Sequence, residues 1–333
     1  MNMLENTLLE VKGLKTYFYL DEGVLKAVDG IDFAIQKGRT LGLVGESGCG
    51  KSVTSQAILN IVPKPGKIEG EVLLYKDGSD KPLDLAKLDP FGPQIRSIRG
   101  AEIAMIFQEP MKAFHPMYTI GNQIMEALLL HVTDNEAEAR DIALDMLGRV
   151  GMPNPKQRID EYPHQLSGGM RQRAMIAMAL CCRPSILIAD EPTTALDVTV
   201  QAQVLQLIKE LQDELGMAVI FITHDLGVIA EMADEVAVMY LGKIVEQCDI
   251  NTIFDEPLHP YTKALLSSIP EIGRPARSKL NVIEGTVPIP LNIGKGCGFY
   301  SRCKDAKEGL CNTEDPPMTE VKPGHYVRCF PNE

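Results

Sequence analysis

Short runs of apolar residues alternate along this chain with longer stretches in which apolar residues recur every three to four positions. Runs of strand length lie at residues 40–44, 102–107, 185–189, 218–222 and 235–240. Helical spacing covers residues 51–61, 120–130, 136–150 and 198–215. Strands that alternate with helices in this way predict an α/β fold with a mostly parallel sheet.

Two parts of the chain depart from that rhythm. Residues 8–36, together with 71–75, have the pattern of an antiparallel β subdomain. After about residue 270 the periodicity disappears, Pro and Gly become dense, and four of the eight cysteines follow. We therefore expect a main domain at 1–270, with helices at about 109–182, and an irregular Cys-containing extension at 271–333.

The composition excludes several classes of protein. Of the 333 residues 45% are hydrophobic, which suffices for a folded core, and no apolar run reaches the ~20 residues of a membrane span. The net charge of −12 argues against nucleic acid as a partner, because binding the phosphate backbone needs a surplus of Lys and Arg. The N-terminus has no signal-peptide pattern, so we expect the chain in the cytosol, with reduced thiols.

A glycine-rich segment at residues 45–52, GESGCGKS, fits the pattern G-x4-G-K-[ST] between an expected strand and an expected helix. In such a P-loop, glycines turn successive backbone N–H groups onto a phosphate, and the N-terminus of the helix adds partial positive charge. Lys51 would then reach the β- and γ-phosphates, and the Ser52 hydroxyl would bind Mg²⁺.

Two carboxylates, Asp190 and Glu191, end the apolar run at 186–189. A carboxylate at the end of a buried strand is costly unless something binds it, so Asp190 is expected to hold the Mg²⁺ shell. Glu191 would lie beside the γ-phosphate and polarise the attacking water. A second glycine turn, LSGGM at 166–170, precedes another helical run and predicts a second anion site.

The P-loop, LSGGM and the strand that ends in Asp190 and Glu191 follow one another in that order along the chain, and together they resemble the ATP-binding cassette of ABC transporters over roughly residues 8–270. The resemblance implies a P-loop ATPase in which Gln108 contacts Mg²⁺ and water, His224 contacts the γ-phosphate, Asp197 belongs to the D-loop and Phe18 stacks on adenine. It implies an ATP site made of Phe18, Gly45, Ser47, Gly48, Cys49, Gly50, Lys51, Ser52 and Val53, with Mg²⁺ held by Ser52, Gln108 and Asp190.

In this family the signature residues Ser167, Gly168 and Gly169 face the ATP of another cassette. One set of motifs per chain therefore implies a dimer that ATP closes and hydrolysis opens. The resemblance also implies two transmembrane permease subunits, an extracytoplasmic substrate-binding protein, and a place at the cytoplasmic face of the membrane.

Further stretches, including HPYTKALL at 259–266, resemble the dipeptide/oligopeptide importer branch, D-type subunit, whose partner cassette is an F-type paralogue. Relatives of this branch import nickel, glutathione or oligosaccharides, so these cargoes stay open beside peptides. A soluble ABC ATPase of DNA repair or translation fits less well, because the chain has a single acidic cassette and no coiled-coil insertion.

The four cysteines of the extension, Cys297, Cys303, Cys311 and Cys329, suggest a metal centre that holds a segment poor in apolar periodicity. Zinc prefers closer Cys pairs, and wider all-Cys spacing suits a [4Fe–4S] cluster, which some members of the branch carry. Four unconnected thiols are the alternative. Lys295, Arg302, Lys304 and Arg328 are expected to offset the negative charge of the cluster.

Overall fold

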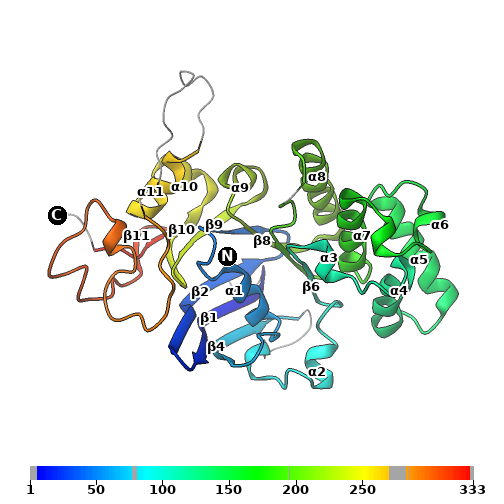
Figure 1. The fold of residues 1–333 in the computed structure, drawn as a ribbon, viewed down its shortest axis with the longest axis horizontal. Helices are drawn as coiled ribbons and strands as arrows, with labels where there is room; N and C mark the ends of the chain where they lie inside the picture. The colour runs from blue at the N-terminus through cyan, green and yellow to red at the C-terminus, as the bar shows by residue number, and fades with distance from the viewer. Residues whose placement is uncertain (1–5, 77–80, 195, 270–282, 284, 331–333) are drawn as a thin grey trace. The chain divides into compact units, whose positions relative to one another are not determined.

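The computed structural model describes residues 6–76, 81–194, 196–269, 283 and 285–330 (Figure 1). They fall into two compact units: the first consists chiefly of Leu88–Ile220, and the second of Leu9–Ile35, Thr40–Lys87 and Phe221–Glu333. None of the helices in the described ranges has the length and apolar character that crossing a membrane requires.

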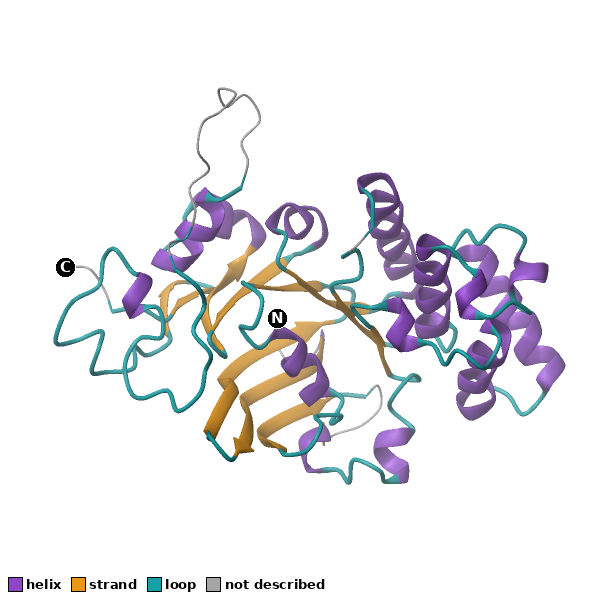
Figure 2. Ribbon diagram, in the orientation of Figure 1, coloured by secondary structure: helices purple, strands orange, loops and turns teal. Residues whose placement is uncertain are grey.

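An antiparallel sheet forms one layer of the second unit, as the pattern of residues 8–36 and 71–75 predicts (Figure 2). Its strand order is β2-β1-β4-β5, and Val11 lies opposite Val72 in the register of β1 and β4. The strands are β1 (Thr7–Leu20), β2 (Gly23–Gln36), β4 (Gly66–Leu74) and β5 (Leu83–Asp84).

The other strands of the second unit follow the order β11-β12-β10-β9-β3. β3 pairs with β9 in parallel, whereas β10, β12 and β11 continue antiparallel. All five residues of β3 are buried, as expected for a strand covered on both faces. The bounds are β3 (Thr40–Val44), β9 (Glu235–Tyr240), β10 (Lys243–Asp249), β11 (Thr319–Lys322) and β12 (His325–Val327).

Short helices complete the second unit. The helix expected at 51–61 ends earlier, because Asn60 takes a left-handed backbone conformation with φ 53° that a helix cannot continue. The helices are α1 (Lys51–Ile58), η2 (Leu85–Lys87), α9 (Leu226–Met232), α10 (Ile250–Asp255), α11 (Pro260–Ser267) and η4 (Tyr300–Arg302).

In the first unit the strand order is β8-β7-β6, with β6 and β7 parallel. Asp197 caps the N-terminus of α8 through the amides of Thr199 and Val200, and Gly216 ends it with φ 65°. The elements are α2 (Pro93–Arg96), β6 (Ile103–Ile106), β7 (Ile186–Asp190), α8 (Val198–Leu215) and β8 (Ala218–Thr223).

Between β6 and β7 the first unit is helical, inside the range of about 109–182 expected from the sequence. Apolar residues of α4, α5 and α7, such as Ile124, Leu147 and Met175, are fully buried where these helices pack together. The bounds are α3 (Pro110–Ala113), α4 (Ile120–His131), α5 (Glu136–Arg149), α6 (Pro155–Arg158), η3 (Pro163–Gln165) and α7 (Gly168–Leu180).

The C-terminal extension is more ordered than its irregular sequence suggests, because β12 pairs with β10 through the partners Glu246–Val327 and Gln247–Tyr326. The expected boundary at 270/271 lies outside the described residues. Beside this pairing, the fully buried Glu246 carboxylate accepts hydrogen bonds from the backbone amides of Leu258 and His259 and contacts His325 Nε2 at 2.8 Å.

Glu246→Ala should lower the free energy of unfolding by about 3–5 kcal/mol, because it leaves His325 and two amides buried without their acceptor. Urea unfolding measures this change. Glu256→Ala, which breaks the exposed ion pair with Lys322, is the control and should leave stability nearly unchanged. Equal stability of the two variants would contradict a role of Glu246 in holding the extension.

Candidate nucleotide-binding site

The glycine-rich segment 45–52 forms the turn between β3 and α1 that the sequence predicts. Gly50 caps α1 with φ 106° and, as a glycine, offers no side chain to cap the first amides of the helix. Those amides are the groups that bind a phosphate in a P-loop. Ser52 and Val53 lie in the first turn of α1.

Only glycine fits at two positions of this loop. A Cβ atom at Gly45 would lie 2.2 Å from the carbonyl oxygen of Met239, and one at Gly50 would lie 2.1 Å from the carbonyl oxygen of Ala27. Both oxygens belong to the backbone of neighbouring strands and cannot move aside. The loop is therefore held against β9 and β2 at its two ends.

Lys51 is 5% exposed, and its ammonium is already directed at the loop. Nζ donates hydrogen bonds to the carbonyl oxygens of Gly45 at 2.7 Å and Glu46 at 3.1 Å. These weak neutral acceptors hold the charge in place, and a triphosphate would offer it a far stronger partner.

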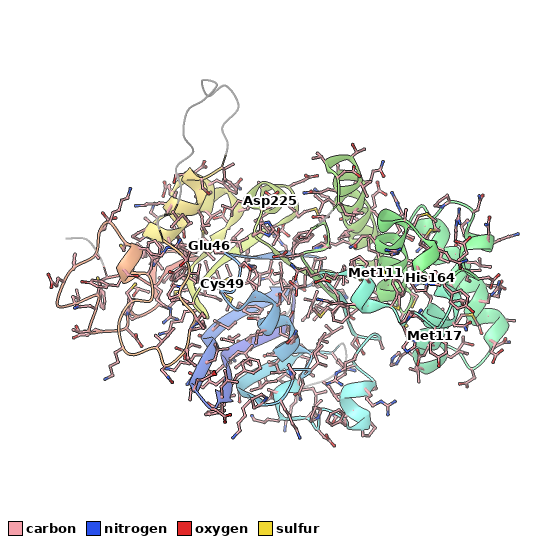
Figure 3. The ribbon with its side chains drawn as sticks, in the orientation of Figure 1. Glu46, Cys49, Met111, Met117, His164 and Asp225 are labelled. Atoms are coloured by element: carbon pink, nitrogen blue, oxygen red, sulfur yellow. The ribbon has the colours of Figure 1, made fainter. Side chains whose placement is uncertain are left out.

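Cys49 lies in the same loop as Glu46 (Figure 3). Burial raises the pKa of its thiol, and the side chain is 1% exposed. A buried neutral thiol is a poor nucleophile, so Cys49 lacks the character of a redox-sensitive cysteine.

In the first unit, Gln108 and Glu191 come together although 83 residues separate them. Gln108 Nε2 donates to Glu191 Oε2 at 2.8 Å, and Thr194 Oγ1 donates to the same oxygen at 3.0 Å. Asp190 is 3% exposed at the end of β7, and Glu191 adopts a left-handed conformation with φ 47°. Such strain in a non-glycine residue recurs at catalytic sites, where it directs a side chain.

His224 is exposed directly after β8, where Asp225 opens α9 by accepting hydrogen bonds from Gly227 and Val228. The signature residues are also exposed: Ser167 caps α7 and accepts a hydrogen bond from Met170, and Gly168 follows it. Both groups are therefore accessible at the N-terminus of a helix, where an anion is favoured.

Three consecutive aromatic residues near the end of β1, Tyr17, Phe18 and Tyr19, have different surroundings. The Tyr17 hydroxyl donates to Asp29, Lys67 lies 5.0 Å from the ring centre of the exposed Tyr19, and Phe18 is half-buried between them. Phe18 has no polar group to satisfy, so its ring is suited to stacking.

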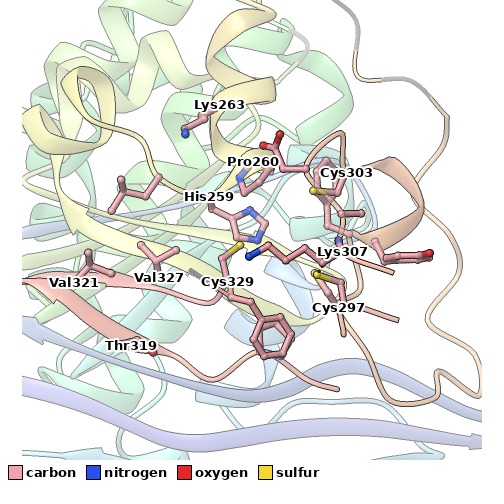
Figure 4. A pocket seen from close by; sticks show the side chains of 18 residues that line it. His259, Pro260, Lys263, Cys297, Cys303, Lys307, Thr319, Val321, Val327 and Cys329 are labelled. Carbon is pink, nitrogen blue, oxygen red and sulfur yellow. Dashed lines mark hydrogen bonds between the residues drawn. The ribbon is translucent and has the colours of Figure 1, made fainter. Parts of the chain in front are cut away.

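The four cysteines of the extension, Cys297, Cys303, Cys311 and Cys329, line one cavity of about 420 Å³ together with His259 (Figure 4). Burial first, and then the neighbouring thiols, raise the pKa of Cys329 to about 11, and burial also raises the pKa of Cys297 and Cys303. Burial lowers the pKa of His259 to about 4, so its imidazole is neutral at pH 7.

Two of the basic residues expected to face a cluster are engaged elsewhere. Arg302 forms an ion pair with Glu46, and Arg328 donates from Nε to the carbonyl oxygen of Ile244 at 3.0 Å. The expectation that Arg302 offsets the charge of a cluster is therefore wrong, because its guanidinium pairs with the Glu46 carboxylate. Lys307 instead lines the cavity, and its amide donates to Cys311 Sγ at 3.4 Å.

The P-loop, the strand that ends in Asp190 and the signature turn define a nucleotide-hydrolysing cassette. Comparison with protein families agrees: residues 28–194 match the ABC transporter model, and residues 245–311 match the model of the oligopeptide/dipeptide transporter C-terminal region. The chain belongs to the ABC transporter ATP-binding proteins, and it is an ATPase of that type.

Curated relatives resemble the chain over nearly its whole length. The oligopeptide transport ATP-binding protein AppD of Bacillus subtilis is 50% identical over 98% of this chain and 97% of its own. The dipeptide transport ATP-binding protein DppD of Escherichia coli is 44% identical over 97% of this chain and 96% of its own. The family and its branch are thus those that the motifs predict.

Solved structures agree on the fold. A dimeric, post-hydrolysis state of the cassette MJ0796, bound to ADP and phosphate, superposes with a TM-score of 0.64 at 27% identity. The match covers 73% of this chain and 99% of that one. The rest of this chain has no counterpart in that structure.

Sequence reasoning missed three contributors. Thr194 fixes the Glu191 carboxylate, and Tyr261 accepts a hydrogen bond from the Glu46 amide at 2.9 Å. The third is the pairing of Arg302 with Glu46. Thr194 lies three residues from Glu191, at a spacing that could have indicated it, whereas the other two contacts join residues more than 200 positions apart.

Gly50→Ala should lower stability by about 2–4 kcal/mol and abolish nucleotide binding, because its Cβ would displace the Ala27 carbonyl or the loop. Gly48→Ala is the matched control, since its Cβ meets no atom within 4 Å and costs only the strain of φ 81°, about 1–2 kcal/mol. Urea unfolding and ADP titration measure both effects. Equal losses in the two variants would show that contact with the Ala27 carbonyl is not the constraint.

Proposed function

We propose that this protein energises the import of peptides through an ABC transporter by binding and hydrolysing ATP. The observation that carries the proposal is the set of family motifs on a chain that matches peptide-importer ATPases from end to end, extension included. Nickel, glutathione and oligosaccharides are the alternative cargoes, and the names of the relatives favour peptides.

ATP would be bound by Phe18 at the adenine and by residues 45–53 at the phosphates, with Lys51 on the β- and γ-phosphates. Ser52, Gln108 and Asp190 would hold Mg²⁺, which supplies charge neutralisation for the leaving phosphate. The buried Asp190 carboxylate and the placement of Lys51 against loop carbonyls support these roles, since each group is held ready for a stronger ligand.

Glu191 would orient and polarise the attacking water, and His224 would contact the γ-phosphate. The hydrogen bonds that Gln108 and Thr194 donate to Oε2 fix the Glu191 carboxylate in one orientation, which supports this role. Gln108 would link the Mg²⁺ and water of the site to the membrane subunit, and its hydrogen bond to the Glu191 carboxylate supports a place beside that water.

The proposed assembly is a dimer with an F-type cassette, on two permease subunits at the cytoplasmic face of the membrane, fed by an extracytoplasmic binding protein. The exposed Ser167 and Gly168, with Gly169 behind them at the N-terminus of α7, would meet the ATP of the partner cassette. Apolar side chains that follow Gln108 are exposed and suit a docking site for the permease: Met111 is 48%, Met117 74% and Tyr118 53% exposed (Figure 3).

In a reconstituted transporter, ATPase turnover should rise when the binding protein is loaded with peptide.

Glu191→Gln should lower kcat by about 10²–10⁴-fold while retaining ATP, because it removes the group that polarises water and keeps the shape of the site. Rates of phosphate release and vesicle uptake of labelled peptide measure both effects.

Lys51→Ala serves as the control that loses ATP binding itself. Wild-type turnover in Glu191→Gln would exclude Glu191 as the base. Stimulation by nickel or an oligosaccharide, and not by peptides, would refute the peptide assignment while leaving the ATPase role intact.

The proposal includes a [4Fe–4S] cluster held by Cys297, Cys303, Cys311 and Cys329. Their convergence on one cavity of about 420 Å³ supports it. Among the described residues no group of three or more His, Cys, Asp or Glu side chains is placed to hold a single metal ion. A cluster is larger and is ligated by thiolates spread around it. When bound, it would cross-link the extension.

Anaerobically purified protein should contain about four iron and four acid-labile sulfide per chain. Cys303→Ser should lose most of the iron and lower the melting temperature, because the cavity loses one ligand of the cross-link. Cys182→Ser, outside the cavity, should keep the iron. Zinc in place of iron and sulfide, or full iron content in Cys303→Ser, would contradict this assignment.

A further inference from the structure

One side chain of the extension reaches the P-loop. Arg302, the last residue of η4, donates from its two terminal nitrogens to the two carboxylate oxygens of Glu46, at 2.7 and 3.0 Å. Glu46 is the second residue of the loop GESGCGKS. A guanidinium and a carboxylate joined by two parallel bonds form the strongest and most directional kind of ion pair between side chains.

The surroundings fix the Arg302 side chain, which is 4% exposed. Its guanidinium lies 5.8 Å from the ring centre of Tyr240 and 5.9 Å from that of Phe299, and it also donates to the Tyr240 hydroxyl at 3.3 Å. The pairing with Glu46 raises the pKa of Arg302 further above its ordinary value. The two aromatic rings and the paired Glu46 carboxylate together leave the guanidinium little freedom to turn away.

Glu46 is held at its backbone as well as at its side chain. Its amide donates to the Tyr261 hydroxyl at 2.9 Å, and its carbonyl oxygen accepts from Lys51 Nζ at 3.1 Å. A single residue thus connects Arg302 with the lysine expected to bind the phosphates. Without Arg302, the Glu46 carboxylate would be an unpaired negative charge at the entrance of a site for an anion.

We propose that Arg302 is a positioning residue for nucleotide binding: it fixes the P-loop through Glu46 and neutralises that carboxylate, so that ATP affinity depends on the C-terminal extension. The proposal rests on the proposed role of residues 45–53 in binding ATP. Cys303, the next residue along the chain, lines the cysteine cavity. The segment that carries Arg302 is therefore fixed between that cavity and the loop.

The test is a double-mutant cycle on the full chain, with Mg-ATP titration, steady-state kinetics and thermal unfolding for each variant. Arg302→Gln should raise the ATP Kd and KM about tenfold and leave kcat within about twofold, because Arg302 touches no reacting atom. Arg302→Gln combined with Glu46→Gln should recover most of the lost affinity, since the repelling carboxylate is then absent. A purely structural role predicts no such recovery.

Lys322→Gln is the matched control, because it removes an exposed ion pair from the extension to Glu256 and should leave ATP affinity unchanged. Arg302→Lys, which keeps the charge and loses the paired geometry, should give an intermediate Kd. If Arg302→Gln does not fold, Arg302→Lys with and without Glu46→Gln decides the question in the same way.

Wild-type affinity in Arg302→Gln, or a double variant that binds ATP no better than the single one, would overturn the proposal. Failure of the unaltered protein to bind ATP would instead refute the proposed function. Lys51→Ala, which removes the phosphate ligand directly, sets the level of complete loss in both comparisons.

Discussion

The close approach of the P-loop to two neighbouring strands is the constraint on which the rest of the second unit depends. Gly45 and Gly50 lie so near the carbonyl oxygens of Met239 and Ala27 that no side chain can be accommodated. This contact fixes the loop relative to β9 and β2, directs its amides inward, and sets the point at which α1 begins. Because β9 pairs with both β3 and β10, the same contact also sets the platform on which the extension is built.

Hydrogen bonds to two carboxylates, Glu246 and Glu46, attach the extension to that platform. The Glu246 carboxylate accepts hydrogen bonds from two backbone amides and contacts His325 Nε2. Arg302 forms an ion pair with Glu46 and lies beside the rings of Tyr240 and Phe299. A buried ion pair adds little net stability over an apolar pair, but it is costly to break and tolerates few geometries. These contacts therefore determine the position of the extension more than they raise the stability of the cassette. Through Arg302 the extension acts as part of the nucleotide-binding unit.

The pattern of apolar residues predicted the cassette well where burial is uniform or helices are amphipathic. β3, β9 and α8 match their expected bounds, because a strand buried on both faces is apolar throughout and a capped helix carries Asp197 and Gly216 at its ends. β11 was missed because an exposed edge strand shows no alternation, and β12 was missed because its three residues are too few to form a pattern. The glycines of the P-loop identified a phosphate site, but the carbonyls that demand glycine come from distant strands. The Arg302 contact could not be predicted either, because it depends on tertiary folding alone.

An acidic protein that binds an anion has to neutralise the carboxylates that lie beside its anion site. The net charge is −12, and the P-loop itself contains Glu46 beside the expected position of a triphosphate. Backbone amides and Lys51 attract the phosphates only if that carboxylate is neutralised, since interactions between charges a few ångströms apart are weakly screened in a partly buried site. Arg302 supplies the neutralising charge from a segment next to the cysteine cavity. The electrostatics of the loop are therefore completed by the extension, which contributes the guanidinium of Arg302 to it.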